Sequence, residues 1–308
     1  MRAVYVSGGS VSVRELPDPE PGPGEVLVSP RLVGICGTDL ELLRGYRGFS
    51  GVPGHEFVGT PLSGRLEGER VVAEINVGCG ECRYCRAGVR EHCLNRQVIG
   101  ITRDGAMAEL VAVPEGNLHR VPDSVSDEEA VFTEPLAAAL RVLETAHVKP
   151  RHEVVVLGAG RLGQLVARVL ALTGCRLTVV DRAEWKLRLL EGLADDLRTS
   201  AEGLEADLVV ECTGRPELLE EAVRIARPMG VVVLKTTSVE PYRVSSALVV
   251  DEVSVLGSRC GPFEAALRLL ERGLVDVRPL ISAVYPLEEA PRAFEEAERS
   301  LKVLIRVG

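Results

Sequence analysis

The sequence contains no run of about 18 apolar residues, so no segment is long enough to span a membrane as a helix. Basic residues are in deficit, because 36 Lys and Arg stand against 45 Asp and Glu, for a net charge of −9. An acidic chain has no electrostatic attraction for a phosphate backbone, which argues against a nucleic-acid-binding protein.

The first residues, MRAVYVSGGSVSV, lack the apolar core and the cleavage site of a secretory signal peptide. We therefore expect a cytoplasmic protein, in which disulfides are disfavoured. The eight cysteines are then expected to be thiols or metal ligands. A length of 308 residues exceeds what one hydrophobic core usually serves, which predicts two domains.

The hydrophobic pattern changes character near Glu134. Before it, short apolar runs alternate with Pro- and Gly-rich stretches, which is typical of β-structure. After it, strands alternate with helices, which predicts an α/β fold with a parallel sheet covered on both faces. The predicted strands of this sheet are 153–157, 176–180, 207–211, 231–235 and 253–256. The predicted helices include 135–146, one ending at 174, one starting near 183, 262–272 and 287–299.

The segment VVVLGAGRLGQLVARVL carries Gly158, Gly160 and Gly163 in the G-x-G-x-x-G spacing. The spacing alone is weak evidence, but here it follows an apolar strand and opens an amphipathic helix. The first glycine permits a tight turn, the second lets the backbone approach a pyrophosphate, and the third lets helix and strand pack closely. Arg161 and Leu162 begin the helix, whose N-terminus would face the phosphates. The alternative is a glycine-rich turn without a ligand.

Asp181 follows the next strand, at about the 20-residue distance where an acidic residue hydrogen-bonds the ribose 2′-hydroxyl of NAD. Arg182 could instead pair with the 2′-phosphate of NADP. We favour NAD because a carboxylate repels phosphate. Thr213 in ECTG and Arg259 in GSRCGP are further candidates for cofactor contacts.

Four cysteines, Cys79, Cys82, Cys85 and Cys93, lie in a C-x₂-C-x₂-C-x₇-C spacing. Four thiolates so close together can form a tetrahedral shell around zinc, and a closed shell has a structural role. An iron–sulfur cluster is the competing interpretation, but Leu94 stands where the proline of that motif would follow. Four unrelated thiols are the remaining alternative.

A second possible metal set is spread over three motifs: Cys36 in GICGTDLELL, His55 in VPGHEFVG and Glu134 in TEPLAAAL. One thiolate, one imidazole and one carboxylate leave a fourth position for water or substrate, which is the form of a catalytic zinc site. Asp39 is expected to fix the tautomer of a ligating His55. For Glu134 the alternative is a structural role in a first helical turn, with Thr133 as N-cap.

In this order, GICGTD, PGHEFVG, the cysteine cluster, EPLA, GAGRLG and GSRCGP resemble the zinc-dependent medium-chain dehydrogenase/reductase family, which includes alcohol, sorbitol, threonine and glucose dehydrogenases. The resemblance covers nearly the whole chain. It implies a GroES-like, β-rich catalytic domain formed by 1–135 and 259–308, and a doubly wound Rossmann domain formed by 136–258. It also implies two Zn²⁺ per subunit, NAD or NADP as cofactor, and a homodimer or homotetramer joined at the edge strand 253–256.

The resemblance implies that Cys36, His55 and Glu134 bind the catalytic zinc, with Glu56 near the metal. Thr38 matches the hydroxyl that accepts the substrate proton. At position 41 many relatives have a histidine that completes a proton relay, whereas this chain has Glu41, which is expected either to relay the proton itself or to be bypassed by another route.

The implied reaction is hydride transfer between the hydroxyl-bearing carbon of an alcohol, polyol or sugar and NAD(P), without a nucleic-acid or membrane partner. A threonine 3-dehydrogenase-like activity is an alternative within the family. Outside it, a non-catalytic nucleotide-binding redox sensor, a zinc-ribbon nucleic-acid protein and a zinc-free quinone or enoyl reductase are competing interpretations.

Overall fold

The computed structural model describes residues 1–236 and 240–308. The chain forms two compact units, one made of Met1–Glu134 and Phe263–Gly308, the other of Pro135–Pro262. The borders predicted at 135/136 and 258/259 lie one and four residues from these. Among the described residues, none of the helices combines the length and the apolar character that crossing a lipid bilayer requires.

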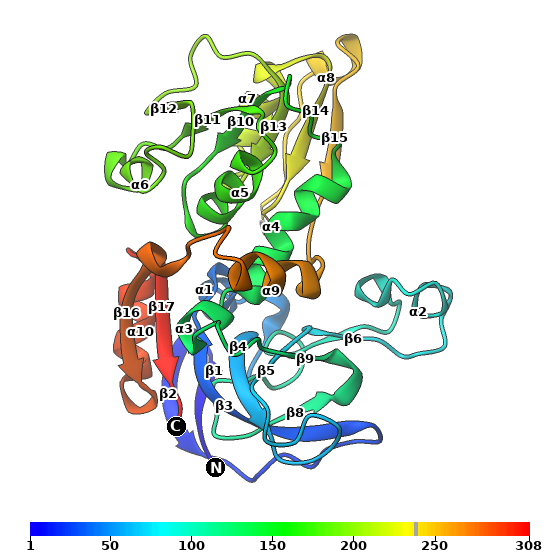
Figure 1. The fold of residues 1–308 in the computed structure, drawn as a ribbon, viewed down its shortest axis with the longest axis vertical. Coiled ribbons are helices and arrows are strands. Elements are labelled where there is room, and N and C mark those ends of the chain that lie inside the picture. Colours follow the sequence, from blue (N-terminus) through cyan, green and yellow to red (C-terminus); the bar gives the residue numbers. More distant parts are fainter. Residues whose placement is uncertain (237–239) are drawn as a thin grey trace. The chain divides into compact units, whose positions relative to one another are not determined.

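The second unit contains a six-stranded parallel sheet (Figure 1). Its strands are β10 (Glu153–Leu157), β11 (Arg176–Val180), β12 (Asp196–Arg198), β13 (Ala206–Glu211), β14 (Ala226–Leu234) and β15 (Ser254–Gly257). Their spatial order is β12-β11-β10-β13-β14-β15, which is the doubly wound order of a dinucleotide-binding Rossmann sheet. The predicted α/β class is confirmed, and β10 and β11 have the predicted bounds.

Helices and a loop cover this sheet. The helices are α4 (Thr133–Thr145), which begins in the first unit, α5 (Arg161–Ala171), α6 (Glu184–Arg188), α7 (Leu218–Ile225) and α8 (Ala247–Val250). Helix α5 packs on β10 and β11, and α7 packs on β13 and β14. Residues 199–205, which connect β12 to β13, contain no helix. Ala201 and Leu204 of this loop pack into the core instead.

The first unit is built on a seven-stranded sheet with the order β16-β17-β3-β4-β5-β9, in which β8 pairs with β3. The strands are β3 (Glu25–Gly34), β4 (Glu56–Pro61), β5 (Val71–Ala73), β8 (Val111–Pro114), β9 (Leu118–Arg120), β16 (Ile281–Pro286) and β17 (Lys302–Arg306). Strand β3 lies between β4 and β17 over its last residues, so the chain after the second unit returns to complete this sheet. Val28, Val33, Met107 and Ile305 are fully buried in its core.

Short elements complete the first unit. They are β1 (Arg2–Ser7), β2 (Ser10–Glu15), β6 (Asn76–Val77), β7 (Gln97–Val98), α1 (Gly37–Leu43), α2 (Arg83–Arg86), α3 (Asp127–Ala130), α9 (Phe263–Glu271) and α10 (Ala290–Ala297). The helix predicted over 287–299 begins with a 3₁₀ turn, and its α-helical part starts at Ala290.

Candidate metal centres and dinucleotide-binding turn

Cys36 occupies a fixed position because β3 is paired on both sides up to Gly34. It precedes the first turn of α1, and its backbone N–H donates to the Asp39 carboxylate (2.8 Å to Oδ2). Such a side-chain acceptor satisfies an amide that the helix leaves unpaired. The Cys36 Sγ lies 3.9 Å from the hydroxyl of Thr38. The motif GICGTD therefore presents a half-buried thiol with a hydroxyl beside it.

His55 immediately precedes β4 and is 3% exposed, and Asp39 is 0% exposed. The His55 Nδ1 lies 3.4 Å from the Asp39 Oδ1, and neither atom has a closer hydrogen-bond partner among the described residues. Burial opposes a charge on the ring, but the Asp39 carboxylate and the Cys36 thiol outweigh burial and raise the pKa of His55 well above its usual range. The Asp39 carboxylate thus faces Nδ1, and Nε2 is the ring nitrogen that stays available to a metal.

The structure brings together a thiol, an imidazole and a carboxylate: ligand atoms of Cys36, His55 and Glu56 all lie within 4.8 Å of one another. Ligand atoms of a four-coordinate zinc lie about 3.3–3.8 Å apart, given zinc bonds of about 2.0–2.3 Å. The donor types and their buried setting therefore fit such an ion. Glu134, which is half-buried in the same unit, is not a member of this group in the described part of the chain.

Thr133 does not cap the helix as expected. It lies inside α4, and its buried hydroxyl donates to the Ala130 carbonyl (2.7 Å). Helix α4 therefore starts two residues earlier than predicted, and Glu134 is in its first turn.

Glu56 has a partner that the sequence did not indicate. The Lys302 Nζ, at the start of β17, donates to the Glu56 Oε2. Both side chains are almost inaccessible to solvent, with 2% of Lys302 and 1% of Glu56 exposed. The metal group thus borders a buried ion pair that joins residues 246 positions apart.

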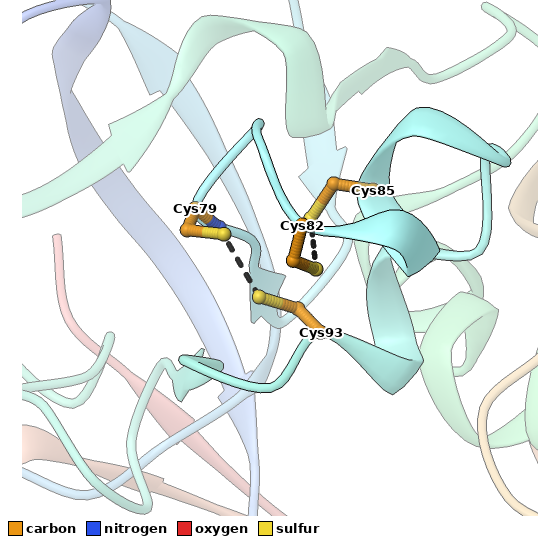
Figure 2. A group of neighbouring side chains, drawn as sticks. All are labelled: Cys79, Cys82, Cys85 and Cys93. Carbon is orange, nitrogen blue, oxygen red and sulfur yellow. Dashed lines mark hydrogen bonds between the residues drawn. The ribbon is translucent and has the colours of Figure 1, made fainter.

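The four cysteines of the second motif point toward one another (Figure 2). Their sulfur atoms lie within 4.8 Å of one another, and the sulfurs of Cys82 and Cys85 are 3.6 Å apart. Four sulfurs bound to one zinc at about 2.3 Å would be spaced by about 3.8 Å, so the cluster fits a zinc ion. The segment with β6 and α2 that carries them extends away from the strands of the seven-stranded sheet (Figure 1).

Backbone amides surround these sulfurs. The amides of Cys79 and Asn95 donate to the Cys93 Sγ (3.3 Å each). Hydrogen bonds from the backbone at Cys85 and Leu94 lower the pKa of the Cys82 thiol to about 6, whereas desolvation raises the pKa of Cys85 to about 11. N–H···S bonds favour thiolates, which are the form that binds a metal.

Glu41 is engaged elsewhere. Its Oε1 accepts from the Nη1 of Arg44, the residue that follows the last turn of α1 (2.6 Å). The structure therefore shows an ion pair at this position, and a relay through Glu41 stays a prediction.

The glycine turn has the geometry that the fingerprint requires. Gly158 has φ +92°, which favours glycine. A Cβ added at Gly163 would lie 1.8 Å from the Gly158 carbonyl oxygen, whereas one added at Gly160 would meet no atom within 4 Å. Gly163 is therefore required by helix packing, and Gly160, at the N-cap of α5, faces open space. Arg161 and Leu162 start the helix and are half-buried.

Asp181 lies beside this turn at the end of β11. Its carboxylate accepts the amides of Ala159 (2.8 Å) and Ala183 (2.9 Å). The side chain of Arg182 is exposed, as is that of Arg259, which donates to the Cys260 Sγ (3.4 Å).

Thr213 is also near the turn, because a Cβ at Gly158 would meet its Cγ2 at 2.9 Å. The amide and the hydroxyl of Thr213 donate to Glu211, and so does the hydroxyl of Thr236 (2.6 Å). Glu211 is fully buried at the end of β13. Sequence reasoning missed it, although a carboxylate that ends a predicted central strand was a usable signal.

Comparisons with known proteins agree with this geometry. The family profile described as "Alcohol dehydrogenase GroES-like domain" matches residues 22–123, and "Glucose dehydrogenase C-terminus" matches residues 128–307. The chain is 30% identical over 349 residues to the erythritol/L-threitol dehydrogenase of Mycolicibacterium smegmatis, covering 98% of this chain and 96% of that one.

Two solved structures share the whole fold. One is a short chain alcohol dehydrogenase from E. coli CFT073 complexed with NADH (TM-score 0.92, 29% identity, 100% of this chain and 99% of that one). The other is a putative zinc-binding dehydrogenase from Sinorhizobium meliloti bound to NADP (TM-score 0.90, 31% identity, 99% of each chain). The predicted combination of a GroES-like domain with a Rossmann sheet is thereby confirmed.

Proposed function

Because the chain belongs to the zinc-dependent medium-chain dehydrogenase/reductase family, we propose that Cys36, His55 and a neighbouring carboxylate form the catalytic zinc centre of an alcohol or polyol dehydrogenase. The enzyme is an oxidoreductase that acts on hydroxyl groups of small molecules and uses NAD(P). The observation that carries the proposal is the meeting of a thiol, an oriented imidazole and a carboxylate within 4.8 Å.

The residues around this centre have distinct roles in the proposed mechanism. When bound, zinc would act as a Lewis acid that lowers the pKa of a hydroxyl group held against it. Cys36 and His55 would hold the ion, and Asp39 would keep the ring proton of His55 on Nδ1. Thr38, whose hydroxyl lies beside Cys36, would accept the substrate proton at Oγ1 as it releases its own hydroxyl proton toward solvent. NAD(P) supplies the hydride acceptor.

Two carboxylates are candidates for the third protein ligand of the zinc. Glu56 belongs to the group in the structure, whereas the resemblance to the family assigns Glu134. Zinc content after dialysis separates the two: the side chain whose alanine variant loses the catalytic zinc is the ligand. Loss of zinc in Glu134→Ala with retention in Glu56→Ala would support the family assignment.

Cys36→Ser tests the function as a whole. We expect turnover to fall below detection while NADH still binds, because the dinucleotide turn belongs to the other unit. The assay follows NADH absorbance with a panel of tetritols, hexitols, glucose and threonine, which also covers a threonine 3-dehydrogenase-like activity. Full activity of Cys36→Ser would contradict the proposal. A wild-type protein that binds NADH but turns over no member of the panel would favour the non-catalytic redox sensor.

The four-cysteine cluster is proposed to hold a second, structural zinc. Cys82→Ser should lower the melting temperature of the first unit before it lowers the turnover of the folded enzyme, since a closed shell stabilises a loop and leaves no open position. Normal melting and normal zinc content in this variant would contradict the assignment. Thiols that must remain reduced to bind metal support the cytoplasm as the proposed compartment.

NAD is the proposed preference over NADP. The Asp181 carboxylate lies between the glycine turn and Ala183, where a 2′-phosphate would be repelled. The ratio of kcat/KM values for NAD and NADP measures this preference. Asp181→Ser should shift the ratio toward NADP, with Arg182 available for the phosphate.

We propose a homodimer or homotetramer in which subunits meet at one edge of the sheet of the second unit. Among the described strands, β15 pairs with β14 alone. Nearby, Met229 (79%), Val249 (74%) and Val250 (77%) are strongly exposed, although they are apolar. The Met229 amide bonds to the Asp251 carbonyl (2.7 Å), so these side chains lie in one region. Light scattering should show a larger species that Val249→Asp dissociates.

A further inference from the structure

Lys302 is a buried cation at the metal group. It is the first residue of β17, it is 2% exposed, and its Nζ donates to the Glu56 carboxylate. The same Nζ lies 5.5 Å from the centre of the Phe132 ring, which is also buried. A lysine is costly to bury without a partner, so this pair is stable only while both members are present.

The backbone leaves little freedom to this ion pair. Gly34 on β3 pairs with Glu56 on one side and with Leu304 on the other. A Cβ at Gly34 would lie 2.7 Å from the Glu56 Oε2 and 3.4 Å from the Lys302 Cδ. The glycine therefore provides the space in which the two side chains meet, and three strands fix their relative position.

The charge of Lys302 acts on the metal group. The Cys36 thiolate and the Glu56 carboxylate would both donate to one divalent cation, and the buried Asp39 stands behind His55. An ammonium group bonded to one oxygen of Glu56 withdraws electron density from that carboxylate. It also places a positive charge near the metal position, where burial leaves it poorly screened. Both effects weaken Glu56 as a ligand.

We propose that Lys302 is a positioning residue of the metal centre: it holds Glu56 by one oxygen and limits how strongly Glu56 binds the metal, which keeps a coordination position open for substrate. This inference rests on the proposed dehydrogenase function. It differs from a structural role, in which Lys302 would only neutralise a buried carboxylate and its loss would affect folding alone.

Lys302→Met tests the proposal through the metal itself. We expect the catalytic zinc to be held several-fold more tightly against a competing chelator, because Glu56 is released toward the metal and a poorly screened positive charge beside the metal is removed. We expect kcat to fall by about tenfold or more, because the open position is partly occupied. The zinc of the four-cysteine cluster provides an internal reference, since its retention should not change. Far-UV circular dichroism selects the folded protein.

Three control variants separate charge from folding. Lys302→Arg keeps the cation and should behave like the wild type. In Lys302→Met/Glu56→Gln the tighter zinc binding should disappear, since the carboxylate that causes it is gone. Lys235→Met removes another buried lysine, in the second unit, where its Nζ donates to the Ala138 carbonyl (2.6 Å). That variant should lose stability without a change in zinc retention.

Weaker or unchanged zinc retention in folded Lys302→Met would overturn the inference, and so would tighter binding that persists in the double variant. Where the methionine variant does not fold, Lys302→Gln replaces it and is expected to shift zinc retention in the same direction. Cys36→Ser distinguishes the two levels of the argument. If that variant keeps its zinc and its turnover, the proposed function fails, whatever Lys302 does.

Discussion

Two glycines of the dinucleotide turn should fail in different ways when each is replaced by alanine. In Gly163→Ala the new Cβ would lie 1.8 Å from a backbone oxygen, and Cβ contacts below 3.0 Å essentially do not occur. Helix α5 must therefore move by more than an ångström relative to the end of β10. In Gly160→Ala the new Cβ meets no protein atom within 4 Å, so the protein itself has room for it.

The magnitudes follow from these contacts. Overpacking of a well-packed site costs about 1–3 kcal/mol, and here the obstacle is backbone, which cannot change rotamer. Alanine returns at most about 1 kcal/mol of helix propensity relative to glycine. We expect the unfolding free energy of the second unit to fall by about 2 kcal/mol in Gly163→Ala, which lowers its melting temperature by roughly 5–10 °C. Gly160→Ala should cost about 0.5–1 kcal/mol, because alanine is a poorer N-cap residue than glycine.

The two variants should rank in the opposite order for NADH binding: relative to its loss of stability, Gly160→Ala should lose more NADH affinity than Gly163→Ala. A methyl group at position 160 occupies the space through which the backbone approaches the pyrophosphate, so the Kd for NADH should rise about tenfold or more, which is about 1.4 kcal/mol. Calorimetry of the metal-loaded protein and NADH fluorescence titration measure the two quantities. Equal melting losses in both variants, or unchanged NADH affinity in Gly160→Ala, would refute the assignment of these glycines.

Three further substitutions test the surroundings of the sites. Asp39→Asn should lower zinc affinity at the Cys36 centre by about 10–100-fold, measured by chelator competition, because His55 loses the carboxylate beside its Nδ1. Glu211→Gln should destabilise the second unit by about 1–3 kcal/mol in urea unfolding, because a fully buried acceptor of Thr213 and Thr236 loses its charge. Glu25 pairs with Arg103 (2.7 Å), and this bond lowers the pKa of the Glu25 carboxyl. A lowered folded-state pKa contributes stability that is present above the unfolded value of about 4.3 and lost as pH falls through the folded value. Glu25→Gln should therefore cost stability at pH 7, and the difference from wild type should shrink as the pH falls below about 4. A difference that stays constant from pH 7 into the acid range would contradict the linkage.

The sequence alone was enough to predict those parts of the structure that depend on residues close together in the chain. Strands β10 and β11 were predicted to the residue because each is a short, mostly apolar run that begins at a charged residue and ends before a glycine or an aspartate. The four-cysteine cluster could be predicted because all four thiols lie within 15 residues of the chain. Strand β12 was not predicted. Asp196–Arg198 is short and two of its three residues are charged, so only its pairing with β11 identifies it as a strand.

The metal centre shows what a local pattern cannot supply. Cys36 and His55 could be proposed as metal ligands from their motifs, since each motif contains a metal-binding side chain within a predicted turn. Lys302 could not, because its buried charge makes sense only beside Glu56, and the pairing of β17 with β3 creates that contact. Gly34 opens the motif GICGTD, but the motif does not reveal why a glycine is needed there, since the atoms that exclude a side chain come from Glu56, Val131 and Lys302.

The order of the strands in the sheet also explains why β17 contributes to the metal centre. The donors of the metal group come from the end of β3 and the start of β4, whereas β17 brings the cation to Glu56. Strand β17 does so because it continues the sheet on the other side of β3. The buried lysine thereby makes the electrostatics of that centre depend on the closure of the first unit.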